Sequence, residues 1–186
     1  MGDSKSYIKG KHILAVDDEE DVLETIEDIL EGAVVDRAGD YETASRKIRE
    51  SVYDLAILDI MGVNGLQLLE EAVAKGIPTV MLTAHAVNPE TLMTSIRKGA
   101  ISYLPKEVLS ELDILLNELL DARAQGQPPW RLLFDKLGKY FDERFGKDWK
   151  ERTWRSGPIS AEPTRSAKAS RNGCSTTPRF REKAYR

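Results

Sequence analysis

The sequence has too few cysteines for two frameworks that are common in small proteins. Its 186 residues include one cysteine, Cys174, which excludes an internal disulfide network and a zinc site made from several cysteines. Its two histidines, His12 and His85, lie far apart, and neither has a second histidine or a cysteine close by as a partner ligand. We interpret both histidines, and Cys174, as bystanders.

Long apolar runs are also missing. No stretch approaches the roughly 18 consecutive apolar residues that a membrane span requires. Residues 1–11 are polar and lack the apolar core of a signal peptide. The composition, 41% hydrophobic and 31% charged, is typical of a soluble globular protein. We therefore expect a cytoplasmic protein with no membrane span.

Basic residues are scarce in the first 129 positions, where twelve Lys and Arg stand against twenty-four Asp and Glu. This part carries a net charge of −12 and repels nucleic acid. Residues 130–156 and 157–186 carry +3 and +5 instead. The basic end is suited to contact an anion or the acidic part of its own chain.

Five short apolar runs alternate with amphipathic segments up to residue 124. The runs lie at 12–16, 33–35, 55–59, 77–82 and 101–104. The segments between them repeat apolar residues at helical spacing, and the last is expected to be one long helix with a leucine stripe at 109, 112, 115, 116 and 119. Asp40 is predicted to cap the second helix. This alternation predicts a doubly wound α/β fold with parallel strands and helices on both faces.

Polar side chains follow or end four of the predicted strands, namely Asp17 with Asp18, Asp59, Thr83 and Lys106. The carboxyl ends of strands converge on one crevice in such a sheet. Crowded carboxylates repel one another, and a hard divalent cation such as Mg²⁺ relieves that repulsion. A carboxylate nucleophile, a metal, an ammonium and a hydroxyl are the groups that a phosphoryl transfer needs.

Each of these residues also has a purely structural interpretation. Asp59 alone would be a turn cap, and Asp17 with Asp18 would be a helix N-cap pair. The Thr83 hydroxyl would bind backbone at a strand end, and Lys106 would be a solvated charge. Their joint position at one sheet edge favours the phosphoryl-transfer interpretation.

Residues 11–124 resemble the receiver domain of the two-component response-regulator family. The resemblance rests on the segments Ile13 to Asp18, Leu55 to Asp59, Val80 to Ala84 and Gly99 to Lys106. It implies a flavodoxin-like, five-stranded parallel sheet in strand order 2-1-3-4-5, with the domain spanning residues 10–124. It also implies a histidine kinase or a phosphotransfer protein as partner.

The resemblance further implies a role for each polar residue. Asp59 would accept a phosphoryl group from the partner or from a small phosphodonor. The ligands implied for Mg²⁺ are Asp17, Asp18, Asp59 itself and the backbone carbonyl of Met61.

The remaining implied roles concern the phosphoryl oxygens and the signal. Thr83 and Lys106 would contact these oxygens. Tyr103 would reorient together with Thr83 and so transmit the phosphorylation state to the face formed by the fourth helix, fifth strand and fifth helix. The structural alternative for Tyr103 is a half-buried aromatic of the sheet.

Two positions depart from the family pattern. The family usually has proline a few residues after the acceptor, where this chain has Gly62, and glycine relaxes the backbone of that loop. The family also usually has a cis proline directly after the lysine. Glu107 follows Lys106 here, so we expect a trans bond.

The chain beyond the receiver divides into three parts. Residues 125–129 are predicted to be a linker, and residues 157–186 a basic tail that is disordered when free. Residues 130–156 are predicted to hold an amphipathic helix with an apolar stripe at Trp130, Leu133, Phe134, Leu137, Phe141 and Phe145. The stripe would pack on the receiver or on a second copy, or else dock to a partner or a membrane surface. Its mixed charges favour protein contact over lipid.

The leading hypothesis is a phosphorelay switch, not an enzyme, that acts through protein contacts and lacks a conventional DNA-binding output domain. One alternative is nucleic-acid binding by the basic tail, although the tail has no helix-turn-helix pattern. The other is a phosphohydrolase with an Asp nucleophile. Such enzymes typically carry a second Asp two residues after the first, where this chain has Met61.

Overall fold

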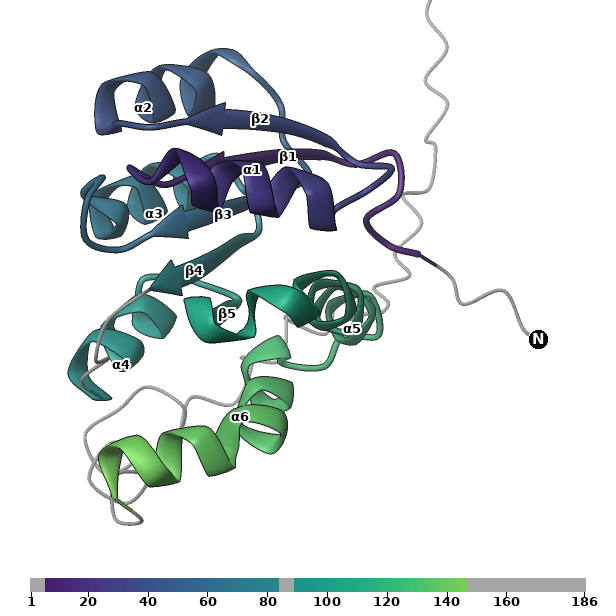
Figure 1. Cartoon of the computed structure of the whole chain (residues 1–186), viewed down its shortest axis with the longest axis vertical. Coiled ribbons are helices and arrows are strands. Elements are labelled where there is room, and N and C mark those ends of the chain that lie inside the picture. The colour runs from purple at the N-terminus through teal and green to yellow at the C-terminus, as the bar shows by residue number, and fades with distance from the viewer. Residues whose placement is uncertain (1–5, 84–88, 147–186) are drawn as a thin grey trace, which may run out of the picture.

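Figure 1 shows the computed structural model of the chain, which describes residues 6–83 and 89–146. Its strands are β1 (His12–Val16), β2 (Val34–Ala38), β3 (Leu55–Asp59), β4 (Thr79–Thr83) and β5 (Ser102–Pro105). Its α-helices are α1 (Glu20–Ile29), α2 (Tyr41–Glu50), α3 (Gly65–Ala74), α4 (Pro89–Arg97), α5 (Leu112–Ala124) and α6 (Pro129–Phe145). A 3₁₀ helix, η1 (Lys106–Glu111), joins β5 to α5.

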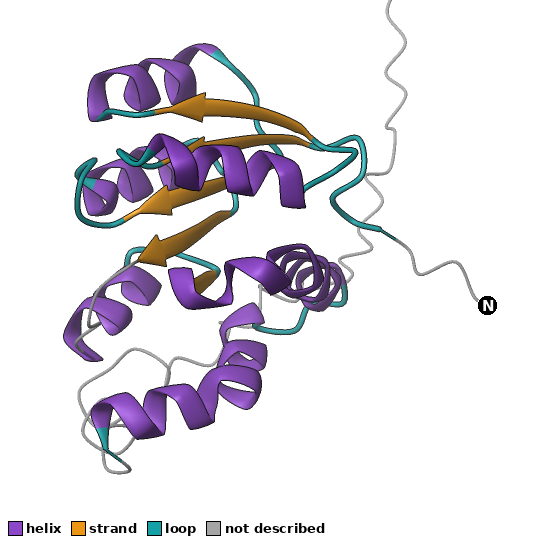
Figure 2. Ribbon diagram, viewed as in Figure 1, coloured by secondary structure: helices purple, strands orange, loops and turns teal. Residues whose placement is uncertain are grey.

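The five strands form one parallel sheet in the order β2-β1-β3-β4-β5. Helices flank this sheet, as Figure 2 shows. The predicted doubly wound fold and its strand order are confirmed. β3 lies at the centre of the sheet, and every residue of β3 and β4 is buried. Their continuous apolar sequences follow from burial on both faces, because helices cover the two sides of a parallel sheet.

Local signals in the sequence explain where several elements begin. The Asp40 carboxylate accepts a hydrogen bond from the Thr43 backbone N–H at 2.8 Å, which confirms the predicted cap of α2. α4 begins at Pro89, a residue whose fixed φ suits the first helical turn. The described peptide bonds are all trans, and the predicted trans bond between Lys106 and Glu107 is among them.

The predicted helix with five leucines was partly wrong. Residues 106–111 form the 3₁₀ helix η1, and the α-helix begins only at Leu112. Leu109 is half-buried, whereas the other four leucines are buried in α5. Apolar spacing does not distinguish a tight 3₁₀ entry from the first α-helical turn, and such entries are common at helix N-termini.

The predicted helix beyond the linker is α6, which ends at Phe145 before Gly146 with φ +77°. Residues 147–156 of that predicted helix and the basic tail, 157–186, lie outside the described residues. His85 and Cys174 also lie outside them. Within the described ranges, no helix is both long enough and apolar enough to cross a membrane.

A buried tyrosine next to the sheet gives a first testable prediction. The Tyr53 hydroxyl donates to Asp36 Oδ2 at 2.7 Å, and this bond is the main reason that the pKa of Asp36 is lowered. Burial, followed by the same bond, raises the pKa of Tyr53 to about 12. We expect Tyr53→Phe to lower the free energy of unfolding by about 1 kcal/mol at neutral pH, since Asp36 is partly exposed to solvent.

The pH dependence of this loss of stability follows from the pKa shifts of Asp36 and Tyr53. The contribution of Asp36 to stability is present above its usual pKa of 3.8. It disappears as the pH falls through the lower pKa that Asp36 has in the folded protein. The Tyr53 contribution is present below pH 10.0 and disappears between 10.0 and about 12. Urea unfolding of both proteins from acid to alkaline pH would show the difference, and a difference that is independent of pH would contradict this account.

Candidate functional site

Four polar side chains meet at the carboxyl edge of the sheet. Asp17 follows β1, Asp59 ends β3, Thr83 ends β4 and Lys106 follows β5. Asp17, Asp59 and Thr83 are at most 3% exposed, and the Lys106 side chain is 11% exposed. Because the strands are parallel and adjacent, their ends deliver these residues to one place, as in other open α/β sheets.

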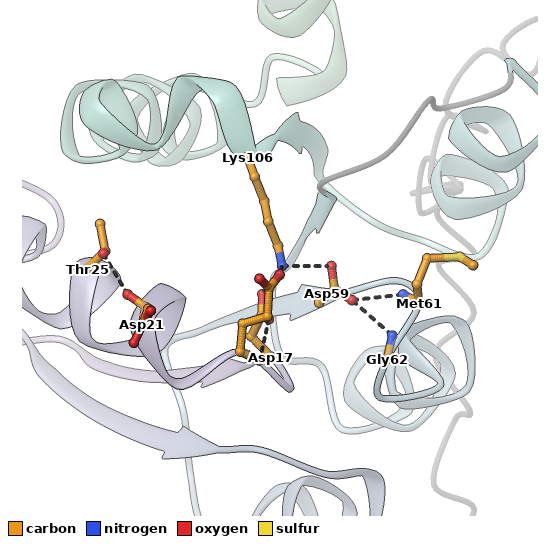
Figure 3. A network of polar contacts seen from close by, with 8 residues as sticks. Asp17, Asp21, Thr25, Asp59, Met61, Gly62 and Lys106 are labelled. Atoms are coloured by element: carbon orange, nitrogen blue, oxygen red, sulfur yellow. Dashed lines mark hydrogen bonds and ion pairs between the residues drawn. The ribbon is translucent and has the colours of Figure 1, made fainter.

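The Lys106 ammonium lies among the carboxylates of this edge (Figure 3). Its Nζ is 2.7 Å from Asp17 Oδ2, 2.8 Å from Glu19 Oε1 and 3.6 Å from Asp59 Oδ1. Burial opposes its charge, but the hydrogen bonds to Asp17 and Glu19 outweigh burial and raise the pKa of Lys106. The lysine is therefore a fixed positive charge beside the Asp59 carboxylate.

Asp17 is the carboxylate whose charge the fold tolerates least. Burial raises its pKa, and the nearby Asp59 charge raises it further. The hydrogen bonds from Lys106 and from the Glu19 backbone N–H oppose this rise without cancelling it. An additional cation at this position would stabilise the ionised form.

The Asp59 carboxylate is oriented by the loop that follows it. Its Oδ2 accepts the backbone N–H groups of Met61 at 2.9 Å and Gly62 at 3.1 Å (Figure 3). Its Oδ1 is left on the side of Lys106. One oxygen is thus fixed by backbone donors, and the other faces the cationic centre, which is an arrangement suited to a nucleophile beside an anion-binding group.

Gly62 has a packing role that its position in the sequence did not reveal. A Cβ atom at this position would lie 2.0 Å from Oδ1 of Asp18, a contact that real side chains do not make. The exposed Asp18 carboxylate therefore occupies the space that a larger residue at position 62 would fill. Glycine allows the acidic loop after β1 to approach the loop after β3.

Tyr103 connects this edge to the outer part of the sheet. Although β5 is the last strand, Tyr103 is 1% exposed. Burial raises its pKa, a hydrogen bond with Thr83 opposes the rise, and Asp59 and Tyr140 add to it. Since β5 pairs with β4 and packs against α6, Tyr103 belongs to the strand that lies between the end of β4 and α6.

The structure brings together most of the residues predicted for the site. Asp17, Asp59 and Lys106 are in direct or near contact, and Thr83 lies on the strand paired with that of Tyr103. Glu19 was not predicted, yet it joins Asp17 and Asp59 around the lysine. A signal was present, because Glu19 directly follows the predicted pair of aspartates and precedes the next helix.

The Met61 side chain and His12, a residue interpreted as a bystander, lie apart from this contact group. The Met61 side chain is 75% exposed, and it is the backbone of Met61 that reaches Asp59. His12 begins β1, away from the carboxyl edge, and its Nε2 is 3.5 Å from Asp36. In the described part of the chain, no three Asp, Glu, His or Cys side chains are grouped as a metal site.

A parallel sheet with an oriented aspartate, a second buried aspartate and a lysine at its carboxyl edge defines the receiver class of signalling domains. Residues 13–117 match the family model of the response regulator receiver domain. The chain therefore belongs to the response-regulator family.

The relatives of the chain include plant and bacterial proteins. It is 32% identical over 109 residues to the two-component response regulator ARR10 of Arabidopsis thaliana, and 35% identical over 95 residues to the two-component response regulator PhoP of Pseudomonas aeruginosa. These alignments cover 55% and 48% of this chain but only 20% and 42% of the two relatives. The match is thus to their receiver part.

A solved structure gives the same result. The CheY-like receiver domain protein from Methanospirillum hungatei JF-1 shares 30% identity and a TM-score of 0.56 with this chain. The likeness covers 98% of that protein and 62% of this chain. A receiver domain therefore corresponds to part of the chain, and α6 lies beyond residues 13–117, the part that matches the receiver family model.

Proposed function

We propose that the chain is a phosphorylation switch of a two-component phosphorelay, with Asp59 as the phosphoryl acceptor. The observation that carries this proposal is the Asp59 carboxylate, buried at the centre of the sheet edge, held by two backbone N–H groups and facing Lys106. The partner is a histidine kinase or a phosphotransfer protein, as the family membership supports.

The proposed transfer proceeds by attack of Asp59 Oδ1 on the phosphorus of a phosphohistidine. A new O–P bond forms while the P–N bond breaks, and its electron pair leaves with the imidazole, which takes up a proton. With acetyl phosphate as donor, a P–O bond breaks and acetate leaves. Lys106 and the Thr83 hydroxyl then bind phosphoryl oxygens, since both groups lie at the same edge.

The donor set at this edge fits Mg²⁺. Buried Asp17, with its raised pKa, is a carboxylate that gains from a further cation, and oxygen ligands are those that Mg²⁺ prefers. We propose that Asp17, Asp18, Asp59 and the Met61 carbonyl hold the ion. When bound, Mg²⁺ neutralises negative charge that the incoming phosphoryl group brings.

The proposed output is a change in protein contacts. The Tyr103 phenol is shared between the site, through Thr83, and the surface of β5. A phosphoryl group that attracts the Thr83 hydroxyl would change the partner of that phenol. The chain would therefore act as a switch whose chemistry serves its own phosphorylation and dephosphorylation.

The direct test is phosphoryl uptake from acetyl phosphate in the presence of Mg²⁺, followed by intact-protein mass spectrometry. We expect the gain of a single phosphoryl group, and little gain when EDTA removes the metal. Hydroxylamine should remove the group, because it cleaves acyl phosphates and leaves serine and threonine phosphates intact. The proposal fails if no group is gained or if the group resists hydroxylamine.

A further inference from the structure

The edge strand β5 is covered, although among the described residues it has a neighbouring strand on one side only. All four of its residues are buried. α6 packs against both β5 and α5, and Figure 1 shows it alongside them beyond the edge of the sheet. Proteins often protect an exposed sheet edge by placing a helix over it. Here the covering helix lies outside residues 13–117, the part of the chain that matches the receiver family model.

α6 is held in this position by its apolar face. Phe141 is 0% exposed and Leu137 8%, and both belong to the main hydrophobic core. The Phe141 ring stacks on Phe145 with centroids 5.6 Å apart. Lys136 forms an ion pair with Glu118 of α5. Of the alternatives for the aromatic stripe, the structure therefore shows this part of it packed on the receiver.

The covered surface is connected to the phosphoryl-acceptor site through Tyr103. Met81 of β4 pairs with Tyr103 of β5 and Thr83 pairs with Pro105, so Thr83 and Tyr103 are diagonal neighbours on one face of these strands. A hydrogen bond with Thr83 also lowers the pKa of the Tyr103 phenol against the effect of burial. Tyr140 of α6 lies close enough to that phenol to interact with it electrostatically. A single buried side chain thus lies between a residue of the site and the helix that covers the sheet edge.

We infer that β5 and α5 form a helix-docking surface, that α6 occupies this surface in the unphosphorylated chain, and that phosphorylation of Asp59 releases it. The inference rests on the proposed function, because it requires phosphoryl transfer to Asp59. The segment that phosphorylation releases from the surface is therefore α6, a part of the chain itself.

The direction of the change follows from the Thr83 hydrogen bond. A phosphoryl oxygen is a stronger acceptor than a phenol, so the Thr83 hydroxyl turns to the phosphoryl group. The Tyr103 phenol then remains buried beneath α6 without that bond. A buried polar group that loses its partner weakens the docked state about tenfold or more.

The short connection explains why α6 occupies the surface before phosphorylation. Only residues 125–128 separate the end of α5 from the start of α6. A helix on so short a linker has an effective concentration of the order of millimolar at its docking surface. A partner at lower concentration gains access to the same surface only when the internal docking is weakened.

Hydrogen exchange on the full chain tests the inference. We expect amide exchange in residues 129–145 to become severalfold faster after treatment with acetyl phosphate and Mg²⁺, in samples whose phosphorylation is verified by mass. The Asp59→Asn protein, treated identically, should show no acceleration. Unchanged or slower exchange in fully phosphorylated wild type would overturn the inference and leave the proposed function standing, whereas failure to phosphorylate would overturn the proposed function.

A matched pair of variants tests the docking itself, without a phosphodonor. Lys136→Glu places a like charge beside Glu118 and should accelerate exchange in α6 severalfold. Lys139→Glu makes the same change of charge at an exposed position of the same helix and should leave the exchange as in wild type. Equal exchange rates in the two variants would contradict docking on α5.

Discussion

Replacing Asp59 with asparagine is expected to abolish the gain of a phosphoryl group from acetyl phosphate and Mg²⁺. The amide has nearly the shape of the carboxylate but lacks the nucleophilic oxygen that attacks phosphorus. Asp59 is 3% exposed, and two backbone N–H groups fix its orientation, so no neighbouring carboxylate can take its place without moving the loop. Intact-protein mass spectrometry should show the unmodified mass only.

Asp54→Asn is the matched control for this experiment. Asp54 lies at the opposite end of β3, where its carboxylate accepts from Lys11 at 2.8 Å and remains 43% exposed. Its variant removes the same charge from the same part of the sequence and should gain the phosphoryl group as wild type does. Equal labelling of the Asp59 and Asp54 variants would show that the acceptor has been assigned to the wrong residue.

The largest effect on stability is expected for Gly65→Ala. A Cβ atom at Gly65 would lie 1.8 Å from the backbone oxygen of Asp59 and 2.9 Å from Cα of Ile60. Both atoms belong to the main chain at the end of the central strand, so they cannot move aside as a flexible side chain would. We expect the free energy of unfolding to fall by about 2–4 kcal/mol, as overpacking against backbone requires.

Gly39→Ala provides the control for this loss. The nearest atom to a Cβ at Gly39 is the Asp17 backbone oxygen at 3.9 Å, an ordinary contact distance. Its free energy of unfolding should stay within about 0.5 kcal/mol of wild type. Urea denaturation of the three proteins measures both values. A Gly65 variant as stable as the Gly39 variant would contradict the close approach of α3 to the end of β3.

The sequence predicted the grouping of polar residues at the carboxyl edge of the sheet because strand ends carry strong local signals. The apolar run that ends at Asp59 specifies a buried central strand, and parallel strands necessarily bring their carboxyl ends together. The three-dimensional role of Glu19 was not predictable in this way. Its contact with Lys106 joins residues that are far apart in the sequence. Acidic residues are also common at helix starts wherever they occur, because the helix dipole stabilises them there.

Apolar periodicity likewise predicted α6 but not its binding surface. The spacing of Leu137 and Phe141 indicates which face of the helix is apolar, and it contains no information about what that face contacts. The fold decides, because β5 is the last strand of the described sheet and α6 packs against both β5 and α5. Gly65 shows a similar limit: a glycine at a helix start does not reveal how closely the chain passes a strand end.

Mapping of the phosphoryl group in the wild-type protein tests the central claim most directly. Borohydride reduces an aspartyl phosphate to homoserine, which marks the acceptor in peptide mass spectra. After treatment with acetyl phosphate and Mg²⁺, the conversion should fall on Asp59. Conversion at Asp17, Asp18 or Asp54, or no conversion in protein that has gained the phosphoryl group, would contradict the account.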